Sequence, residues 1–269
     1  MLRTRVIPCL LLRNRGLVKT VRFAKPAYVG DPVNTVRIFN EKEVDELVVL
    51  DITAACERRG PQNELLREIA SECFMPLTYG GGVRTLEEMH ALFQLGVEKV
   101  VLGTSAFEDP SLVERAAARF GSQAVLVSID VKQRRRMLGL HAGEKGVFVR
   151  NARDDTGLDP VSAARLMEQR GAGELLLTSA DRDGTMGGYD LELVAQVCAA
   201  VHMPVIACGG AGSVSDLGAA VHAGASGAAA GSLFVYQGKN RAVLINFPAR
   251  AELRAHLAGS VAAHATTRP

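Results

Sequence analysis

The chain has 269 residues, 48% of them hydrophobic, and a formal net charge of +2 at pH 7. This near balance of charge gives no reason to expect a nucleic-acid partner. No apolar run approaches the roughly 18 to 20 residues of a membrane span, and the N-terminus does not have the pattern of a secretion signal, so we expect a cytoplasmic protein that does not bind membranes. The five cysteines have no CxxC spacing, which indicates neither a disulfide framework nor a zinc site, and we expect no metal and no cofactor.

Apolar runs of strand length alternate with helix-period segments along the chain. Strands are predicted at 4–12, 46–52, 75–80, 98–103, 124–130, 174–179, 203–208 and 226–231. Helices are predicted at about 32–44, 62–73, 85–95, 109–118, 159–170, 190–201, 214–223 and 247–257. The alternation predicts an α/β fold, a single closed (β/α)₈ TIM barrel over residues 1–258, with a disordered tail at 259–269. An open doubly wound sheet is the alternative.

Two connections, 13–31 and 131–158, are longer than the other linkers. Both follow predicted strands, which places them on the C-terminal face of a barrel, where barrel enzymes carry their active sites. We therefore interpret both as candidate lids.

Residues 75–104 and 203–232 align without a gap at a constant offset of 128. Each copy reads as an apolar strand, a glycine-rich turn, an amphipathic helix and a second strand that ends in a small residue and a hydroxyl. The repeat predicts that the barrel arose by duplication of a half-barrel.

The glycine-rich turns are candidate phosphate sites, because backbone N–H groups at such strand-to-helix junctions form a concave anion site. The first site comprises Gly81, Gly82, Gly103 and Thr104, and the second comprises Gly209, Gly210, Gly231 and Ser232, with Gly184 as a further candidate. Two opposed sites predict a small-molecule ligand phosphorylated at both ends. The alternative is that the glycines only allow sharp turns.

Acid–base candidates lie where predicted strands end, since only these positions reach the cavity of a barrel. Asp51, Asp130, Asp181 and Asp183 satisfy this condition. Lys19, in the first long connection, is a candidate electrostatic clamp over a ligand. We predict catalytic roles for Asp130, Lys19, Asp51 and Asp183.

The stretches DELVVLDITA, PLTYGGGVRT, RFGSQAVLVSIDVK, GAGELLLTSADRDGT and PVIACGGAG closely resemble the cyclase subunit of imidazole glycerol phosphate synthase, over about residues 1–235. The resemblance implies a (β/α)₈ barrel that receives ammonia from a glutaminase docked at its N-terminal face. It also implies that this ammonia splits and cyclises a bis-phosphorylated ribonucleotide.

The family's ammonia gate is a ring of salt-bridged residues at the N-terminal end of the barrel, and Arg5, Glu46, Lys99 and Glu174 match it. Charged residues at the starts of apolar strands are costly to bury alone, so we expect mutual pairing around the barrel axis. The alternative is that the ring is only a plug at the bottom of the barrel.

Two positions depart from the family pattern. Asp130 matches one of the two catalytic aspartates, but Leu11 occupies the position of the other, and Gly103 replaces a usual asparagine. Leucine can neither donate nor accept a proton, so the substitution argues against ordinary cyclisation.

The stretches IPCLLL and LTYGGGV are similar to a divergent branch of this superfamily, the acetamidino-modification barrels of surface-polysaccharide sugar biosynthesis. This similarity favours an ammonia-supplying subunit for sugar amidation, with an ATP-dependent amidotransferase as a further partner. Two alternatives remain: a true imidazole glycerol phosphate synthase cyclase, a lyase of histidine biosynthesis, and a non-catalytic barrel that binds a phosphorylated ligand.

Overall fold

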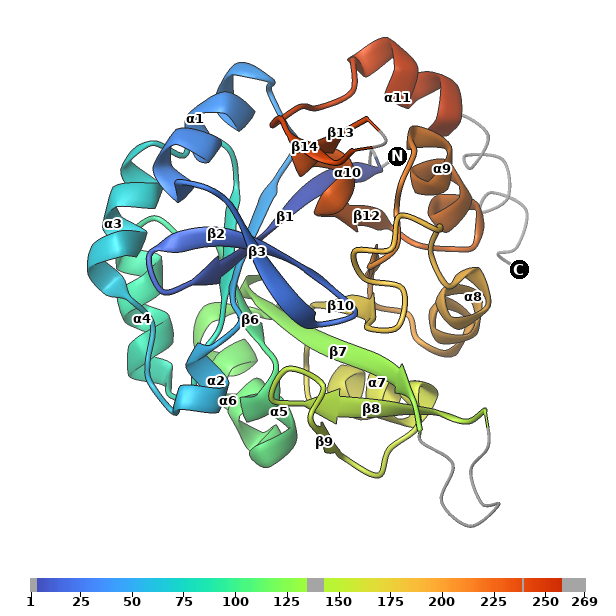
Figure 1. Cartoon of the computed structure of the whole chain (residues 1–269). Helices are drawn as coiled ribbons and strands as arrows, with labels where there is room; N and C mark the ends of the chain where they lie inside the picture. Colours follow the sequence, from blue (N-terminus) through green and yellow to red (C-terminus); the bar gives the residue numbers. More distant parts are fainter. Residues whose placement is uncertain (1–3, 135–142, 239, 258–269) are drawn as a thin grey trace.

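A computed structural model describes residues 4–134, 143–238 and 240–257. Eight parallel strands form the barrel (Figure 1): β1 (Arg5–Arg13), β4 (Leu47–Asp51), β5 (Leu77–Gly80), β6 (Lys99–Leu102), β7 (Val125–Gln133), β10 (Glu174–Ser179), β11 (Val205–Cys208) and β12 (Gly227–Ala230). Each pairs with the next, and β12 pairs with β1 to close the ring. The predicted barrel is confirmed, and the open-sheet alternative is wrong.

Eight helices surround the barrel at the predicted places (Figure 1): α1 (Pro32–Glu41), α3 (Asn63–Ser71), α4 (Leu86–Gln94), α6 (Pro110–Phe120), α7 (Pro160–Gln169), α8 (Leu191–Ala200), α9 (Val214–His222) and α11 (Arg250–Leu257). Three of them begin at an Asp–Pro pair, in which the aspartate side chain caps the helix and proline supplies the first helical φ. Helix α1 is shorter than predicted, because the backbone is left-handed at Glu43, with φ of 51°.

The strands bury side chains on both faces, which is why their sequences read as nearly continuous apolar runs. One face packs against the helices. The other fills the barrel interior with a cluster of Ile7, Cys9, Val48, Val101, Leu126, Leu176, Ile206, Cys208 and Ala229. The barrel interior is therefore lined largely with apolar groups.

Both long connections contain strands that the sequence did not predict. In the first, β2 (Gly16–Val21) and β3 (Ala24–Gly30) form an antiparallel hairpin that extends β1 and crosses the front of the barrel in Figure 1. In the second, β8 (Lys145–Val149) pairs with β7, and β9 (Asp154–Asp155) pairs with β8. Part of this connection, 135–142, lies outside the described residues, as does the predicted tail at 259–269.

The remaining elements are short. They are α2 (Ala54–Glu57), α5 (Thr104–Glu108), the 3₁₀ turn η1 (Ser122–Ala124), α10 (Ser232–Val235), β13 (Tyr236–Gln237) and β14 (Ala242–Val243). Helices α2, α5 and α10 each follow a barrel strand.

The two repeated segments fold alike. The α4 helix begins with a capping box of Thr85 and Glu88, and the α9 helix begins with the equivalent box of Ser213 and Asp216. In both copies the paired glycines before these helices have positive φ. The predicted half-barrel duplication is therefore visible in the backbone.

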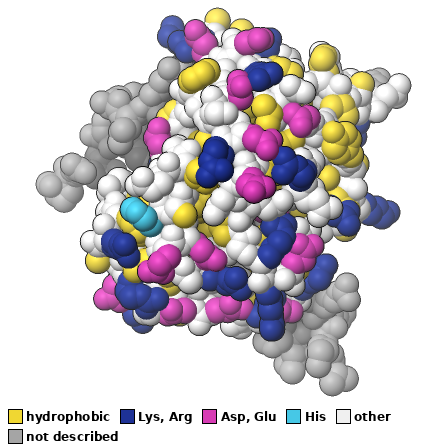
Figure 2. Space-filling view, turned by 90° about the vertical axis from the view of Figure 1, so that its left-hand side faces the viewer, with side chains coloured by type: hydrophobic (Ala, Val, Ile, Leu, Met, Phe, Trp, Pro, Cys, Tyr) yellow, Lys and Arg dark blue, Asp and Glu magenta, His cyan; other side chains and the backbone are white. Residues whose placement is uncertain are grey.

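The outer face that carries α1, α3 and α4 mixes acidic and basic side chains across its surface (Figure 2). Some of these side chains form exposed ion pairs, such as Arg15 with Glu68 and Arg37 with Glu72. No helix within the described ranges is long and apolar enough to cross a membrane.

Candidate active site

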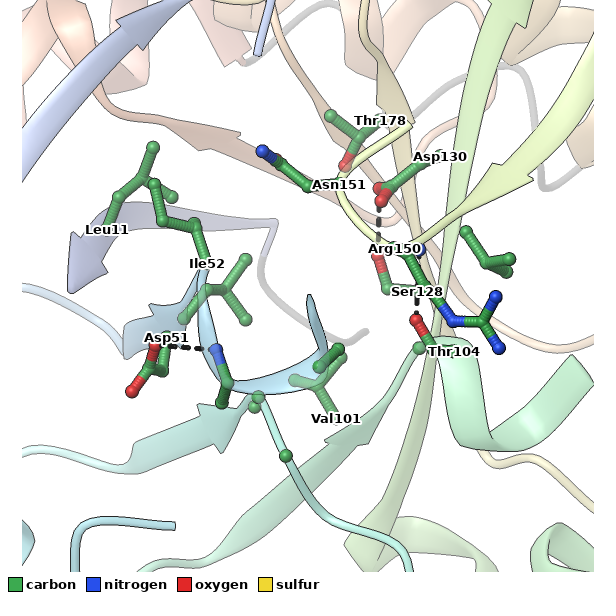
Figure 3. A pocket seen from close by; sticks show the side chains of 18 of the residues that line it. Leu11, Asp51, Ile52, Val101, Thr104, Ser128, Asp130, Arg150, Asn151 and Thr178 are labelled. Atoms are coloured by element: carbon green, nitrogen blue, oxygen red, sulfur yellow. Dashed lines mark hydrogen bonds between the residues drawn. The ribbon is translucent and has the colours of Figure 1, made fainter. Parts of the chain in front are cut away.

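A cavity of about 360 Å³ opens at the C-terminal end of the barrel. Its wall includes residues from the ends of β1, β4, β6 and β7 and from the segment after β8 (Figure 3). The hairpin contributes Lys19, Thr20 and Phe23. This is the end at which the aspartates were predicted to gather, and Asp51, Asp130 and Asp183 all line the cavity.

Asp130 lies on β7 and projects into this cavity. The Ser128 hydroxyl, two residues earlier on the same face of the strand, donates a hydrogen bond of 3.2 Å to its carboxylate. Figure 3 shows Asn151 and Thr178 beside it. Burial raises the pKa of Asp130 to about 7, against a lowering by the Ser128 hydrogen bond, and the charge of Asp183 adds to the rise. At neutral pH both protonation states of this carboxyl group are therefore populated, and it can either donate or accept a proton.

Leu11 lines the same cavity from β1 and lies across it from Asp130 in Figure 3. It is paired in register with Leu50 on β4, and both leucines pack against the apolar barrel interior. The predicted loss of one aspartate thus concerns a side chain at the cavity wall.

Lys19 and Asp183 form a buried ion pair across the mouth of the barrel. The Lys19 ammonium lies 2.9 and 3.0 Å from the two carboxylate oxygens of Asp183, and the Thr20 hydroxyl donates to the same carboxylate at 3.1 Å. The Arg22 amide also donates to the Asp183 carbonyl oxygen at 2.8 Å. These contacts hold the hairpin against the segment after β10.

Asp51, another predicted catalytic residue, has a carboxylate that already accepts several hydrogen bonds within the protein. Its carboxylate accepts from the amides of Thr53 and Ala54 and from the side chains of Arg59 and Gln62. A second Arg59 nitrogen lies 2.7 Å away as an ion pair. This arrangement favours a role in fixing the start of α2 over proton transfer. Asp181 is similarly engaged, since it accepts from the Gln133 amide at 2.7 Å.

The first predicted phosphate site reaches the cavity. Gly81, Gly82, Gly103 and Thr104 all line it. A Cβ atom at Gly81 or Gly82 would meet a backbone oxygen at 2.4 Å, of Asp51 and Arg59 respectively, so glycine is required by both space and positive φ. The Gly81–Gly82 turn therefore packs directly against the backbone at the end of β4 and in the connection after it.

The second predicted phosphate site reaches the cavity only through Gly231. Gly184 packs against Thr20, and Gly209 packs against Ser179. Gly210 accepts a hydrogen bond from the Gly188 amide at 2.9 Å. A Cβ atom at any of these three glycines would meet the backbone of another segment, at Thr20, Ser179 and Gly188 respectively, and none of the three lines the cavity. Ser232, next to Gly231, has a buried hydroxyl without a hydrogen-bond partner among the described residues.

The floor of the barrel carries the predicted ring of charges. Arg5 pairs with both Glu46 and Glu174, and Lys99 lies 3.2 Å from Glu46 and 3.0 Å from Glu174. Thr78 donates a further hydrogen bond of 2.9 Å to Glu46. Each cation therefore bridges both buried carboxylates, and the ring is closed, as the sequence predicted.

The match to known proteins covers most of the chain. Residues 5–241 match the family described as histidine biosynthesis protein. The chain belongs to this family. A Pseudomonas aeruginosa protein, provisionally named imidazole glycerol phosphate synthase subunit hisF2, is 53% identical over 92% of this chain and 97% of its own length. A Vibrio vulnificus protein, provisionally named subunit hisF3, is 46% identical over 94% and 95%. Imidazole glycerol phosphate synthase subunit HisF of Alkaliphilus metalliredigens is 46% identical over 88% and 92%.

In this member of the histidine biosynthesis protein family, the cavity is also lined by four arginines that the sequence did not single out: Arg58, Arg59, Arg84 and Arg150. Two of these positions could have been found from the sequence, because Arg58 follows the strand end at Asp51 and Arg84 follows the Gly81–Gly82 turn. Arg150 had no such signal, because it lies in a long connection whose path the sequence does not define.

Proposed function

We propose that the chain is the cyclase-type synthase subunit of a glutamine-dependent complex, of the imidazole glycerol phosphate synthase class of lyases. A glutaminase docked at the N-terminal face would supply ammonia through the ring of Arg5, Glu46, Lys99 and Glu174. The observation that carries this proposal is the closed charged ring below an apolar interior that leads to the cavity with Asp130. The names of the relatives support this class over the sugar-amidating subunit that the sequence favoured.

The chemistry follows from the polarity along the barrel. The interior above the ring is lined by Ile7, Val48, Leu126, Leu176 and Ile206, among others. Such a lining favours neutral ammonia over ammonium, because an unpaired cation loses its hydration there. At the top, the Asp130 carboxyl is the group able to exchange a proton with a reacting nitrogen. The glycine turn at Gly81 and Gly82 offers one end of the cavity to a phosphate group.

Turnover with ammonium salts tests the proposal directly. The purified chain, given the bis-phosphorylated ribonucleotide and an ammonium salt at pH 8, is expected to form the imidazole product without any glutaminase. Product formation is followed by chromatography and mass spectrometry. Absence of product under these conditions, with a folded protein, contradicts the cyclase assignment.

A second candidate function is favoured by one observation, Leu11 at the cavity wall. A cavity with one of two acid–base groups suits a subunit that passes ammonia on, so that a sugar is amidated by an ATP-dependent amidotransferase. Purification of the chain from its own cells distinguishes the two candidates. Recovery of a glutaminase together with an ATP-using enzyme favours sugar amidation, and recovery of a glutaminase alone with ribonucleotide turnover favours the cyclase.

Replacement of Lys99 by alanine tests the gate. Arg5 still bridges Glu46 and Glu174 in this variant, so the two carboxylates keep a cationic partner. We expect the fold to persist while ammonia leaks at the floor. Glutamine-dependent turnover should fall severalfold relative to turnover with ammonium salts. Replacement of the exposed Lys42 by alanine is the control, and an unchanged ratio of the two activities would refute the gate role of Lys99.

A further inference from the structure

One wall of the cavity is formed by arginines from three separate segments. Arg58 ends the short helix α2, Arg84 follows the Gly81–Gly82 turn, and Arg150 follows β8. Two contacts join these segments. Arg84 donates a hydrogen bond of 3.2 Å to the carbonyl oxygen of Arg58, and the Cys56 thiol lies 3.5 Å from the carbonyl oxygen of Arg150.

The charges of this wall are only partly neutralised. Within the part of the chain that the structure describes, Arg58 makes no ion pair, and Arg84 reaches Glu88 only at 4.0 Å. Arg150 is held by Glu108 and by Asp154, but both of these carboxylates are about half exposed. By contrast, Lys19 and Arg59 are each matched by a buried aspartate in the same cavity. Arg58 and Arg84 therefore carry charges that no close carboxylate matches, whereas Arg150 is held by Glu108, which also lines the cavity.

The backbone is strained at two of these three arginines, Arg58 and Arg150. Arg58 has φ of 54°, and Arg150, Asn151 and Ala152 have φ of 51°, 59° and 55°. In residues other than glycine, this left-handed conformation costs about 1 kcal/mol or more of free energy. Such strain persists where the surrounding structure imposes it, and here it occurs at both arginines that line the cavity from these two segments. This is the pattern expected of a ligand clamp.

The same side of the cavity has unfilled space. A Cβ atom added at Gly103 would meet nothing within 4 Å. Thr104, the next residue, accepts a hydrogen bond of 3.1 Å from the Arg150 amide, so that its own hydroxyl hydrogen remains available to a ligand (Figure 3). A single phosphate cradled by the glycine turn does not need three guanidinium groups beyond it. A second phosphoryl group would use these guanidinium groups, because guanidinium pairs with phosphate oxygens through two parallel hydrogen bonds.

We infer that Arg58, Arg84 and Arg150 form a subsite for a diphosphate group, so that the substrate class extends to compounds that carry a diphosphate at this end. The inference rests on the phosphorylated substrate of the proposed function and adds a second phosphoryl group at one end of it. The first phosphoryl group binds at the Gly81–Gly82 turn, and the second binds among the guanidinium groups.

Calorimetric titration of the full chain with inorganic diphosphate and with inorganic phosphate tests the inference. Diphosphate is expected to bind at least about tenfold more tightly than phosphate. Arg58→Gln and Arg84→Gln should each weaken diphosphate binding about tenfold, since a hydrogen bond to a charged group contributes that much. Phosphate binding should change less than about threefold in both variants. Arg153→Gln is the matched control, because this exposed arginine lies on the same segment as Arg150 but not in the cavity wall.

The possible results distinguish the diphosphate subsite from the phosphate site on which it depends. Equal affinity for the two anions, or diphosphate binding that is unaffected by both glutamine variants, overturns the subsite while leaving the phosphate site intact. Failure of both anions to bind the folded protein overturns the phosphorylated substrate as well. Circular dichroism of each variant verifies that the barrel is folded.

Discussion

An Asp130→Asn variant is expected to lose about 10² to 10⁴ of its ammonium-dependent turnover, the range that a positioned acid or base contributes. Asparagine keeps the size of the side chain and can still accept from Ser128, so that the cavity retains its shape while proton transfer is lost. Turnover of the bis-phosphorylated ribonucleotide with ammonium salts is the measurement. Glu43→Gln, the same chemical change at an exposed position paired with Arg250, serves as the control.

The same variant should also change how stability depends on pH. Burial raises the pKa of Asp130 to about 7, whereas an unfolded aspartate titrates near about 4. Because the folded state binds this proton more tightly, the contribution of Asp130 to stability is fully present below about pH 4 and is lost as pH rises through about 7. Asparagine has no such loss. The variant should therefore melt at a higher temperature than the original protein at pH 8, with the difference shrinking toward pH 4.

Activity and stability are thus expected to move in opposite directions at one residue, which is characteristic of a functional group kept in an unfavourable setting. The original protein should also show a change in kcat/KM with a midpoint near pH 7, which the variant lacks. If Asp130→Asn kept its turnover, or melted at the same temperature as the original protein at every pH, Asp130 would be a structural residue of β7.

The sequence predicted the barrel because its signals are local and repeated. Apolar strands bounded by turns, Asp–Pro helix starts and the duplicated glycine turns each specify an element without reference to distant residues. The ring on the floor was also predictable in part. Arg5, Lys99 and Glu174 each begin an otherwise apolar strand, and closed barrels bring strand starts together. Their role as an ammonia gate came from resemblance alone and remains a prediction.

What the sequence did not predict depends on contacts between loops. The pairing of Lys19 with Asp183 joins residues 164 positions apart, across a hairpin that had no strong strand signal. Gly209 packs against Ser179 at the end of β10, and Gly210 packs against Gly188 in the segment that follows, and no pattern around those glycines indicates these contacts. Asp51 looked like a free carboxylate at a strand end, because its donors lie mainly in the connection that follows it. In these cases the sequence located the end of the barrel strand correctly, but it did not show which residues of other loops contact it.

Leu11→Asp is expected to raise ammonium-dependent turnover of the bis-phosphorylated ribonucleotide by about 10²-fold or more, if the second acid–base group is the limiting defect of this cavity. The new carboxylate would stand across the cavity from Asp130, in the position that the resemblance to the cyclase subunit assigns to a second aspartate. The side chain at position 11 is only partly buried, so the cavity can hydrate the added charge and the barrel should still fold.

Leu11→Asn is the matched control, because asparagine has the polarity and shape of aspartate without its proton chemistry. A gain with aspartate and none with asparagine identifies Leu11 as the residue that sets the level of cyclisation. If both variants are inactive although each binds phosphate, the cavity lacks more than one group, and delivery of ammonia to another enzyme becomes the better account. If the original protein already turns over rapidly and aspartate adds nothing, Asp130 suffices alone, and the second aspartate of the family is dispensable in this barrel.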